Sequence, residues 1–128
     1  MRTYITIFNT RKMKVLIDAT VREFFIELVI TLTEKGYFSY EEDAHEYVNE
    51  LFKEIKTNLP RMRHKPAPTY YDRYCKDLYY ATIRTNKRTH WYPFFSKYEK
   101  DGETIYMVCY IGNNHTEAHR LYDGFKKL

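Results

Sequence analysis

The chain has 128 residues, of which 44% are hydrophobic and 30% are charged, and its formal net charge is +4. This length predicts one compact domain over residues 1–128 that buries roughly two-thirds of its unfolded surface. The sequence contains neither a cleavable apolar leader nor an apolar run of about 20 residues, which argues against a membrane protein. The only two cysteines, Cys75 and Cys109, are far apart in sequence, which favours a reducing, cytoplasmic location.

Two short strands are predicted near the N-terminus. Residues 3–8 and 13–17 both alternate β-branched or aromatic residues with others, and turn-prone and basic residues join them. Either run could belong to the core sheet.

A first helix is predicted from Thr20, because Thr20 and Glu23 have the spacing of a capping box. Gly36, which can adopt a left-handed conformation, is expected to end it. One face of this helix is apolar, through Val21, Phe24, Phe25, Leu28, Val29 and Leu32.

A second helix follows the same pattern. Ser39 and Glu42 repeat the capping box, and Pro60 is expected to stop the helix. Its apolar face comprises Ala44, Tyr47, Val48, Leu51, Phe52 and Ile55. His45 beside this face is expected at the rim or in solvent rather than as a ligand. Together the two helices predict an αα-hairpin that needs a sheet or another helix to cover its apolar stripes.

The rest of the chain is predicted to be mainly sheet. The basic, proline-containing segment 61–68 is expected to be a loop or linker. Strands are predicted over residues 78–84, 89–98 and 104–111, with turns at 85–87 and 100–102. The tail from residue 113 is expected to form a brief helix or an irregular lid. The predicted fold class is α+β, with an N-terminal strand and an αα-hairpin packed on a three- to four-stranded, mainly antiparallel sheet.

The positive charge is concentrated in one third of the chain. Residues 1–60 have eight basic and ten acidic side chains (net −2), residues 61–95 have eight and two (net +6), and residues 96–128 have five of each. Such a concentrated field attracts polyanions and indicates nucleic acid or an acidic protein as partner. The residues predicted to bind RNA are Arg61, Arg63, Lys65, Arg73, Lys76, Lys87 and Arg120.

Most cofactor-dependent chemistries lack their usual motifs here. The sequence has no Gly-rich phosphate loop, no dinucleotide fingerprint and no Ser-His-Asp order. His115 and His119 have helical i, i+4 spacing, but no third metal ligand lies near them in sequence. We therefore predict no cofactor and no metal site.

The remaining polar residues suit cleavage or binding of RNA without metal. Cleavage needs a group that takes the 2′-hydroxyl proton, cations that neutralise charge on phosphorus, and an acid for the 5′-oxygen. Arg84 and Arg88 suit phosphate binding, and His90 or His115 could exchange protons near neutral pH. Tyr122 could stack on a base or donate a proton. The simpler alternative is that residues 84–90 form only a solvated turn and a half-exposed strand.

Three segments carry a resemblance to a known family: residues 63–84, residues 86–95 (Asn-Lys-Arg-Thr-His-Trp-Tyr-Pro-Phe-Phe) and residues 110–115 (Tyr-Ile-Gly-Asn-Asn-His). Together with the predicted order of elements, they make residues 13–122 resemble the RelE/ParE family of bacterial type II toxins. Residues 1–12 lie outside the likeness, as an added strand or a start-site artefact.

The resemblance implies a function and partners. Ribonuclease members of the family enter the ribosomal A site and cut the bound mRNA. By position, Arg84 and Arg88 match the family's sheet arginines, whereas His115 and Tyr122 match its C-terminal catalytic region. Residues 113–115 depart from the basic run usual there.

Two alternatives belong to other functional classes. Other members of the fold inhibit DNA gyrase by protein binding, and a third possibility is an RNA-binding protein without catalysis. In each toxin class a cognate antitoxin protein holds the toxin inactive. An exposed apolar groove at Phe25 and Phe52 would suit that partner, although both residues are also expected in the core.

Overall fold

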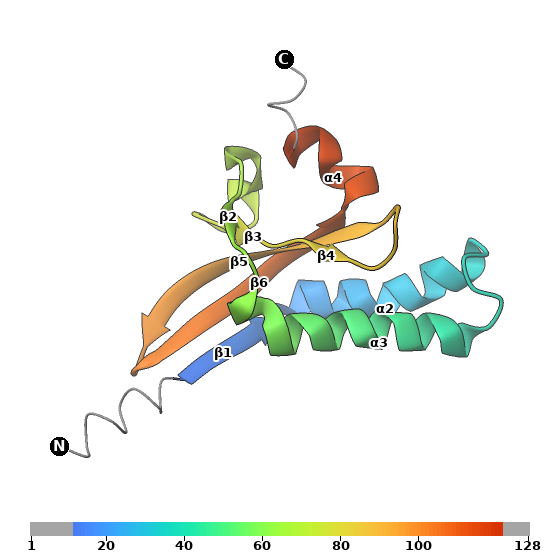
Figure 1. The fold of residues 1–128 in the computed structure, drawn as a ribbon, viewed down its shortest axis with the longest axis horizontal. Helices are drawn as coiled ribbons and strands as arrows, with labels where there is room; N and C mark the ends of the chain where they lie inside the picture. The colour runs from blue at the N-terminus through green and yellow to red at the C-terminus, as the bar shows by residue number, and fades with distance from the viewer. Residues whose placement is uncertain (1–11, 122–128) are drawn as a thin grey trace.

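The structure is a computed structural model, and it describes residues 12–121. The helices are α2 (Ala19–Glu34), α3 (Glu41–Asn58) and α4 (Asn114–Leu121), with short 3₁₀ turns η1 (Leu59–Arg61) and η2 (Thr69–Arg73). The strands are β1 (Lys12–Ile17), β2 (Lys65–Pro66), β3 (Tyr79–Tyr80), β4 (Ile83–Arg84), β5 (His90–Lys100) and β6 (Glu103–Asn113). Helices α2 and α3 lie side by side on one face of the sheet, and α4 lies on the other side (Figure 1). The α+β class is therefore confirmed.

The six strands form one mixed sheet in the order β1-β6-β5-β3-β2, with β4 also paired to β5. Strand β1 runs parallel to β6, whereas the other pairs are antiparallel. The turn between β5 and β6 has positive φ at Asp101 (51°) and Gly102 (79°), as a type I′ turn requires. The predicted turn at 100–102 is confirmed.

The first helix ends where the sequence predicts but begins earlier. Gly36 has φ 78°, and Tyr37 N donates to Leu32 O at 3.0 Å, which closes the helix with a Schellman-type bond. The predicted N-cap at Thr20 is wrong. Asp18 is the N-cap, because its carboxylate accepts from Thr20 Oγ1 at 2.5 Å and from Thr20 N at 3.0 Å, and these two bonds, the hydroxyl bond first, lower the pKa of Asp18.

The second helix has no capping box. Its N-cap is Tyr40, whose side chain makes no capping bond, so the predicted box at Ser39 and Glu42 is wrong. The acidic residues 41–43 occupy the first turn, where the helix dipole favours negative charge. The predicted stop at Pro60 is confirmed, since α3 gives way to η1 there.

The sheet is covered on both faces, and this produces two cores. The predicted helix faces supply Val21, Phe25, Leu28, Val29, Ala44, Val48, Leu51 and Ile55 to the first core. The second core lies on the opposite face and contains Tyr71, Leu78, Tyr80, Tyr92 and Phe94. Alternation along β5 sends Trp91 and Phe95 into the first core and Tyr92 and Phe94 into the second. Residues 91–95 are all buried for this reason.

The prediction of three to four strands is wrong, since residues 12–121 already form a sheet of six. The run predicted over 78–84 breaks at Ala81 and Thr82 into the two-residue strands β3 and β4. In the predicted loop 61–68, Lys65 and Pro66 pair with β3 as the edge strand β2, where proline is tolerated. The strand predicted over 3–8 lies outside the described residues. Between residues 12 and 121 there is no helix with the length and apolar character that crossing a membrane requires.

Candidate nucleic-acid interface

The first pair of predicted site residues meets across β4 and β5. Arg84 and His90 are directly opposite in this ladder, and Arg84 Nε donates to His90 Nε2 at 3.2 Å. Because Nε2 accepts this bond, the ring proton of a neutral His90 lies on Nδ1, where it can be donated to a ligand. Arg84 is exposed and keeps its terminal N–H groups for an anion.

The loop between β4 and β5 is held by a side-chain turn. Asn86 Oδ1 accepts from Arg88 N at 2.8 Å and from Thr89 N at 2.9 Å. This Asx turn fixes the backbone without needing the side chains of Lys87 and Arg88, which are both exposed. Three cations therefore project from one hairpin.

Asn114 joins this hairpin to the start of α4. Its Oδ1 accepts from His90 N at 2.8 Å, and its Nδ2 donates to Arg88 O at 2.9 Å. The preceding Asn113 caps α4 by accepting from His115 N at 2.8 Å. His115, which is exposed, is therefore held at the same end of the sheet as Arg84, Arg88 and His90. Tyr122, the remaining predicted catalytic residue, lies outside the described residues.

The sheet edge extends this basic surface. Arg63 and Lys65 line a small depression of about 200 Å³ with Tyr80 and Thr82. Thr82 and Arg84 are both exposed, whereas Ile83 between them is buried, so the depression borders the side of the chain on which Arg84 lies. Arg61 is not part of this surface, because its guanidinium donates to Asn58 Oδ1 at 2.7 Å at the end of α3.

A second cationic cluster forms on the face covered by η2 and α4. Tyr70 is stacked between two guanidinium groups: Arg73 lies 3.7 Å and Arg120 3.8 Å from its ring centroid. Arg73 Nε also donates to Tyr70 O at 2.9 Å. Lys76 is exposed a few residues later. The structure thus divides the predicted RNA-binding residues into two groups, with Arg61 in neither.

A buried carboxylate holds α4 in place, and sequence reasoning missed it. Glu117 is 3% exposed and accepts from Tyr71 OH at 2.7 Å and from Tyr110 OH at 2.8 Å. Arg120 lies 3.5 Å from the same carboxylate. Burial, together with the bonds to Glu117, raises the pKa of both tyrosines.

The half-buried thiol of Cys109 and the phenols bonded to Glu117 predict a loss of stability in alkali. Burial and the neighbouring Cys75 raise the pKa of Cys109 to about 12. The folded state then keeps protons that the unfolded chain loses above about pH 9, so stability falls as pH rises from there. We expect the free energy of urea unfolding to be constant from pH 7 to 8.5 and lower at pH 10.5.

The matched variant for this prediction is Cys109→Ala. Its free energy of unfolding should fall less than that of the wild type between pH 8.5 and 10.5. The difference between the two proteins should stay below about 1.4 kcal/mol per pH unit, because the thiol is partly exposed to solvent. If the free energy of unfolding of the wild type rises between pH 8.5 and 10.5, the folded state does not keep more protons than the unfolded chain, and the prediction is wrong.

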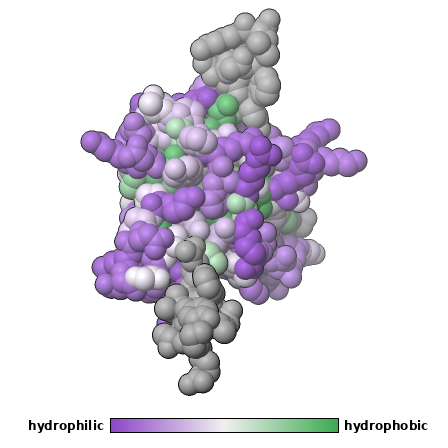
Figure 2. All heavy atoms as spheres, turned by 60° about the vertical axis from the view of Figure 1, so that its left-hand side comes forward, coloured by the Kyte–Doolittle hydropathy of each residue, from purple (hydrophilic) through white to green (hydrophobic). Residues whose placement is uncertain are grey.

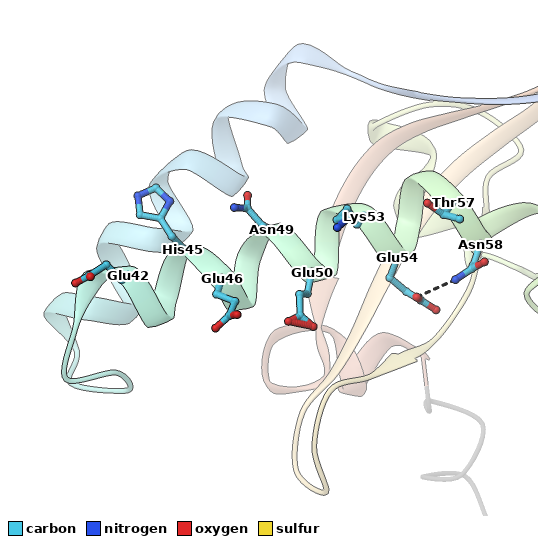
Figure 3. A pocket seen from close by; sticks show the side chains of 9 residues that line it. All are labelled: Glu42, His45, Glu46, Asn49, Glu50, Lys53, Glu54, Thr57 and Asn58. Atoms are coloured by element: carbon cyan, nitrogen blue, oxygen red, sulfur yellow. Dashed lines mark hydrogen bonds between the residues drawn. The ribbon is translucent and has the colours of Figure 1, made fainter.

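An acidic stripe borders the basic edge. Glu42, Glu46, Glu50 and Glu54 repeat every four residues and point to the same side of α3 (Figure 3). Glu50 and Glu54 also line a depression of about 310 Å³ together with Arg84. Phosphates are repelled by this stripe, which favours a path from Arg84 toward Arg63 and Lys65 or toward α4.

A shallow apolar groove lies between α2 and α3. Phe25, Ile26, Val29 and Phe52 line it, and its volume is about 360 Å³. Phe25 is buried and Phe52 half-buried, so the two phenylalanines serve the core and also border the groove. Figure 2 shows the side of the molecule that lies on the left in Figure 1. Hydrophilic side chains dominate this side, and hydrophobic residues form only small patches on it. His45 is exposed beside the groove, as predicted, within 3.8 Å of Glu41.

Within residues 12–121, no group of three His, Cys, Asp or Glu side chains is arranged to hold a metal ion. Comparison with protein families, with curated proteins and with solved structures finds no match to this chain.

Proposed function

We propose that this chain is a RelE/ParE-like type II toxin that cleaves mRNA on the ribosome without a metal ion. The observation that carries the proposal is the arrangement of Arg84, Arg88, His90 and His115 at one end of the sheet, fixed by Asn114. Four groups that suit phosphate binding and proton transfer meet there, although they come from two strands, the loop between them and a helix. The order strand, αα-hairpin and antiparallel meander also supports the resemblance.

The proposed reaction is an internal transfer at phosphorus. His115 takes the proton of a 2′-hydroxyl, the 2′-oxygen bonds to phosphorus, and the bond to the 5′-oxygen breaks. The products are a 2′,3′-cyclic phosphate and a 5′-hydroxyl, whose proton comes from His90 Nδ1 or from water. Arg84 and Arg88 neutralise the charge that develops on the phosphate oxygens.

The groove between α2 and α3 is the proposed contact with the cognate antitoxin. It presents Phe25, Ile26 and Phe52 on the helical layer. An amphipathic helix of the antitoxin would cover this apolar surface. The groove and the basic hairpin involve different residues, so binding of antitoxin and binding of RNA can be tested separately.

A translating extract tests the proposal. We expect purified protein to produce new mRNA 5′ ends within minutes, mapped by primer extension, and only on messages that ribosomes are translating. Protein-free extract and extract with translation initiation blocked serve as controls, and both should keep the message intact.

The alternatives give different results in the same experiment. Intact mRNA together with reduced supercoiling by purified gyrase would replace the nuclease with a gyrase inhibitor. Intact mRNA, unaffected gyrase and retained RNA binding would leave a non-catalytic RNA-binding protein. In either case the proposed reaction would be wrong.

A further inference from the structure

A pocket of about 380 Å³ lies beside the hairpin of β4 and β5, between the end of α2 and the start of α4. This volume falls in the range of about 300–1,000 Å³ that small-ligand sites have. Its apolar wall comprises Leu28, Leu32, Phe38, Tyr47 and Trp91. Its polar wall includes Asn86, Asn113 and His115, and Lys35 lies at its border.

The aromatic wall is rigid and offers ring surface rather than polar atoms. Trp91 Nε1 donates to Tyr47 OH at 2.8 Å, and Tyr47 OH is also bonded to Thr85 Oγ1 at 2.9 Å. The rings of Phe38 and Tyr47 lie 5.5 Å apart. The polar atoms of Trp91 and Tyr47 are bonded internally and Trp91 is only 3% exposed, so a ligand meets mainly the half-buried rings of Phe38 and Tyr47. A flat, polarisable ring suits such a surface.

The polar wall presents hydrogen-bond donors. Asn86 Oδ1 is occupied by the N–H groups of residues 88 and 89, and Asn113 Oδ1 by those of residues 115 and 116. Both carboxamides are thereby oriented, with the Nδ2 amino group as the part that can serve a ligand. Lys35 adds further donors. A ligand ring with adjacent acceptors is therefore favoured over one with an amino group at the same edge.

The neighbouring cations place a phosphate next to such a ring. Lys87 and Arg88 directly follow Asn86 on the same turn, and His115 lines the pocket itself. A ribonucleotide could thus put its base against the rings of Phe38 and Tyr47 and its phosphate on Arg88, with the ribose near His115. The geometry combines a base site and a phosphate site.

We infer that this pocket binds guanine, through its O6 and N7 acceptors, and selects the nucleotide at which the RNA is cut. This inference rests on the proposed function for its role in cleavage, but guanine binding itself does not depend on catalysis. Adenine is disfavoured because its N6 amino group would meet the amino groups of Asn86 and Asn113.

Trp91 is the only tryptophan of the chain, so its fluorescence reports on this pocket. The probes are two 2′-deoxytrinucleotides with thymine at both ends and guanine or adenine in the centre, which lack the 2′-hydroxyl and cannot be cleaved by the proposed reaction. We expect saturable changes in Trp91 emission, with the guanine probe binding at least about fivefold more tightly.

Replacing the Nδ2 donor of Asn86 or Asn113 by an acceptor tests whether these amino groups face the base. Asn113→Asp and Asn86→Asp keep the Oδ1 atom that holds the helix cap or the turn, but replace the Nδ2 donor with an acceptor. Both variants should abolish or invert the preference for guanine. Asn49→Asp adds the same charge on the exposed part of α3 and should leave the guanine-to-adenine ratio unchanged.

The outcomes separate this inference from the proposed function. Equal affinity for both probes, or a ratio unaltered in both pocket variants that retain wild-type melting temperatures, would overturn the guanine site even if mRNA is cleaved. Guanine selectivity that depends on Asn86 and Asn113 would support the site even if mRNA stays intact, and only the nuclease would then be rejected.

Discussion

Replacement of Arg84 by alanine is expected to slow mRNA cleavage by about 100-fold, because a guanidinium that stabilises charge on the reacting phosphate is lost. Arg84→Lys should be intermediate, since lysine keeps the charge but not the planar fork. The measurement is the rate of appearance of new mRNA 5′ ends in the translating extract.

Stability separates a catalytic role of Arg84 from a structural one. Arg84 is exposed, and its only described side-chain bond is to His90, so Arg84→Ala should change the free energy of unfolding by less than about 0.5 kcal/mol. Lys53→Ala removes one positive charge from the exposed side of α3 and should cleave at the wild-type rate. Equal cleavage rates for Arg84→Ala and Lys53→Ala would remove Arg84 from the proposed site.

The largest loss of stability is expected from Glu117→Ala, about 3 kcal/mol. The substitution deprives Tyr71 and Tyr110 of their hydrogen-bond acceptor, and Tyr71 is fully buried. It also leaves Arg120 without its carboxylate partner. Urea unfolding monitored by circular dichroism gives the difference in free energy.

Two further variants test the explanation of this loss. Gly112→Ala keeps Glu117 but should destabilise the protein by displacing its carboxylate, because a Cβ at Gly112 would lie 2.5 Å from Glu117 Cγ and 2.7 Å from its Oε2. Glu46→Ala, on the exposed side of α3, should change stability by less than about 0.5 kcal/mol. If Glu117→Ala is as mild as Glu46→Ala, the buried network does not anchor α4.

The parts of the fold that depend on local chemistry were predictable from sequence. Gly36, Pro60 and the turn at Asp101 and Gly102 act through backbone conformations that few other residues adopt. The N-cap at Asp18 was missed because Thr20 offered an equally plausible capping pattern two residues later. Strand β2 was missed because its pairing depends on β3, which is distant in sequence.

The candidate site was predictable in its residue types but not in its connections. The cluster of Arg84, Arg88 and His90 follows from the charge pattern, whereas the link through Asn114 joins residues 24 and 26 positions apart. An asparagine pair before a helix could have suggested a cap, but not a bond to a distant loop. Glu117 resembles a surface residue in sequence, because carboxylates are rarely buried unless they are paired.

The Asn114 side chain behaves like an additional peptide group. Its amide accepts from the N–H of His90 and donates to the C=O of Arg88, two backbone groups on either side of Thr89 that point toward α4. One side chain at the start of a helix thus satisfies two backbone groups of the loop that no strand covers. The proposed phosphate-binding loop can open only when these two bonds break, so the loop and the N-terminal turn of α4 form one cooperative unit.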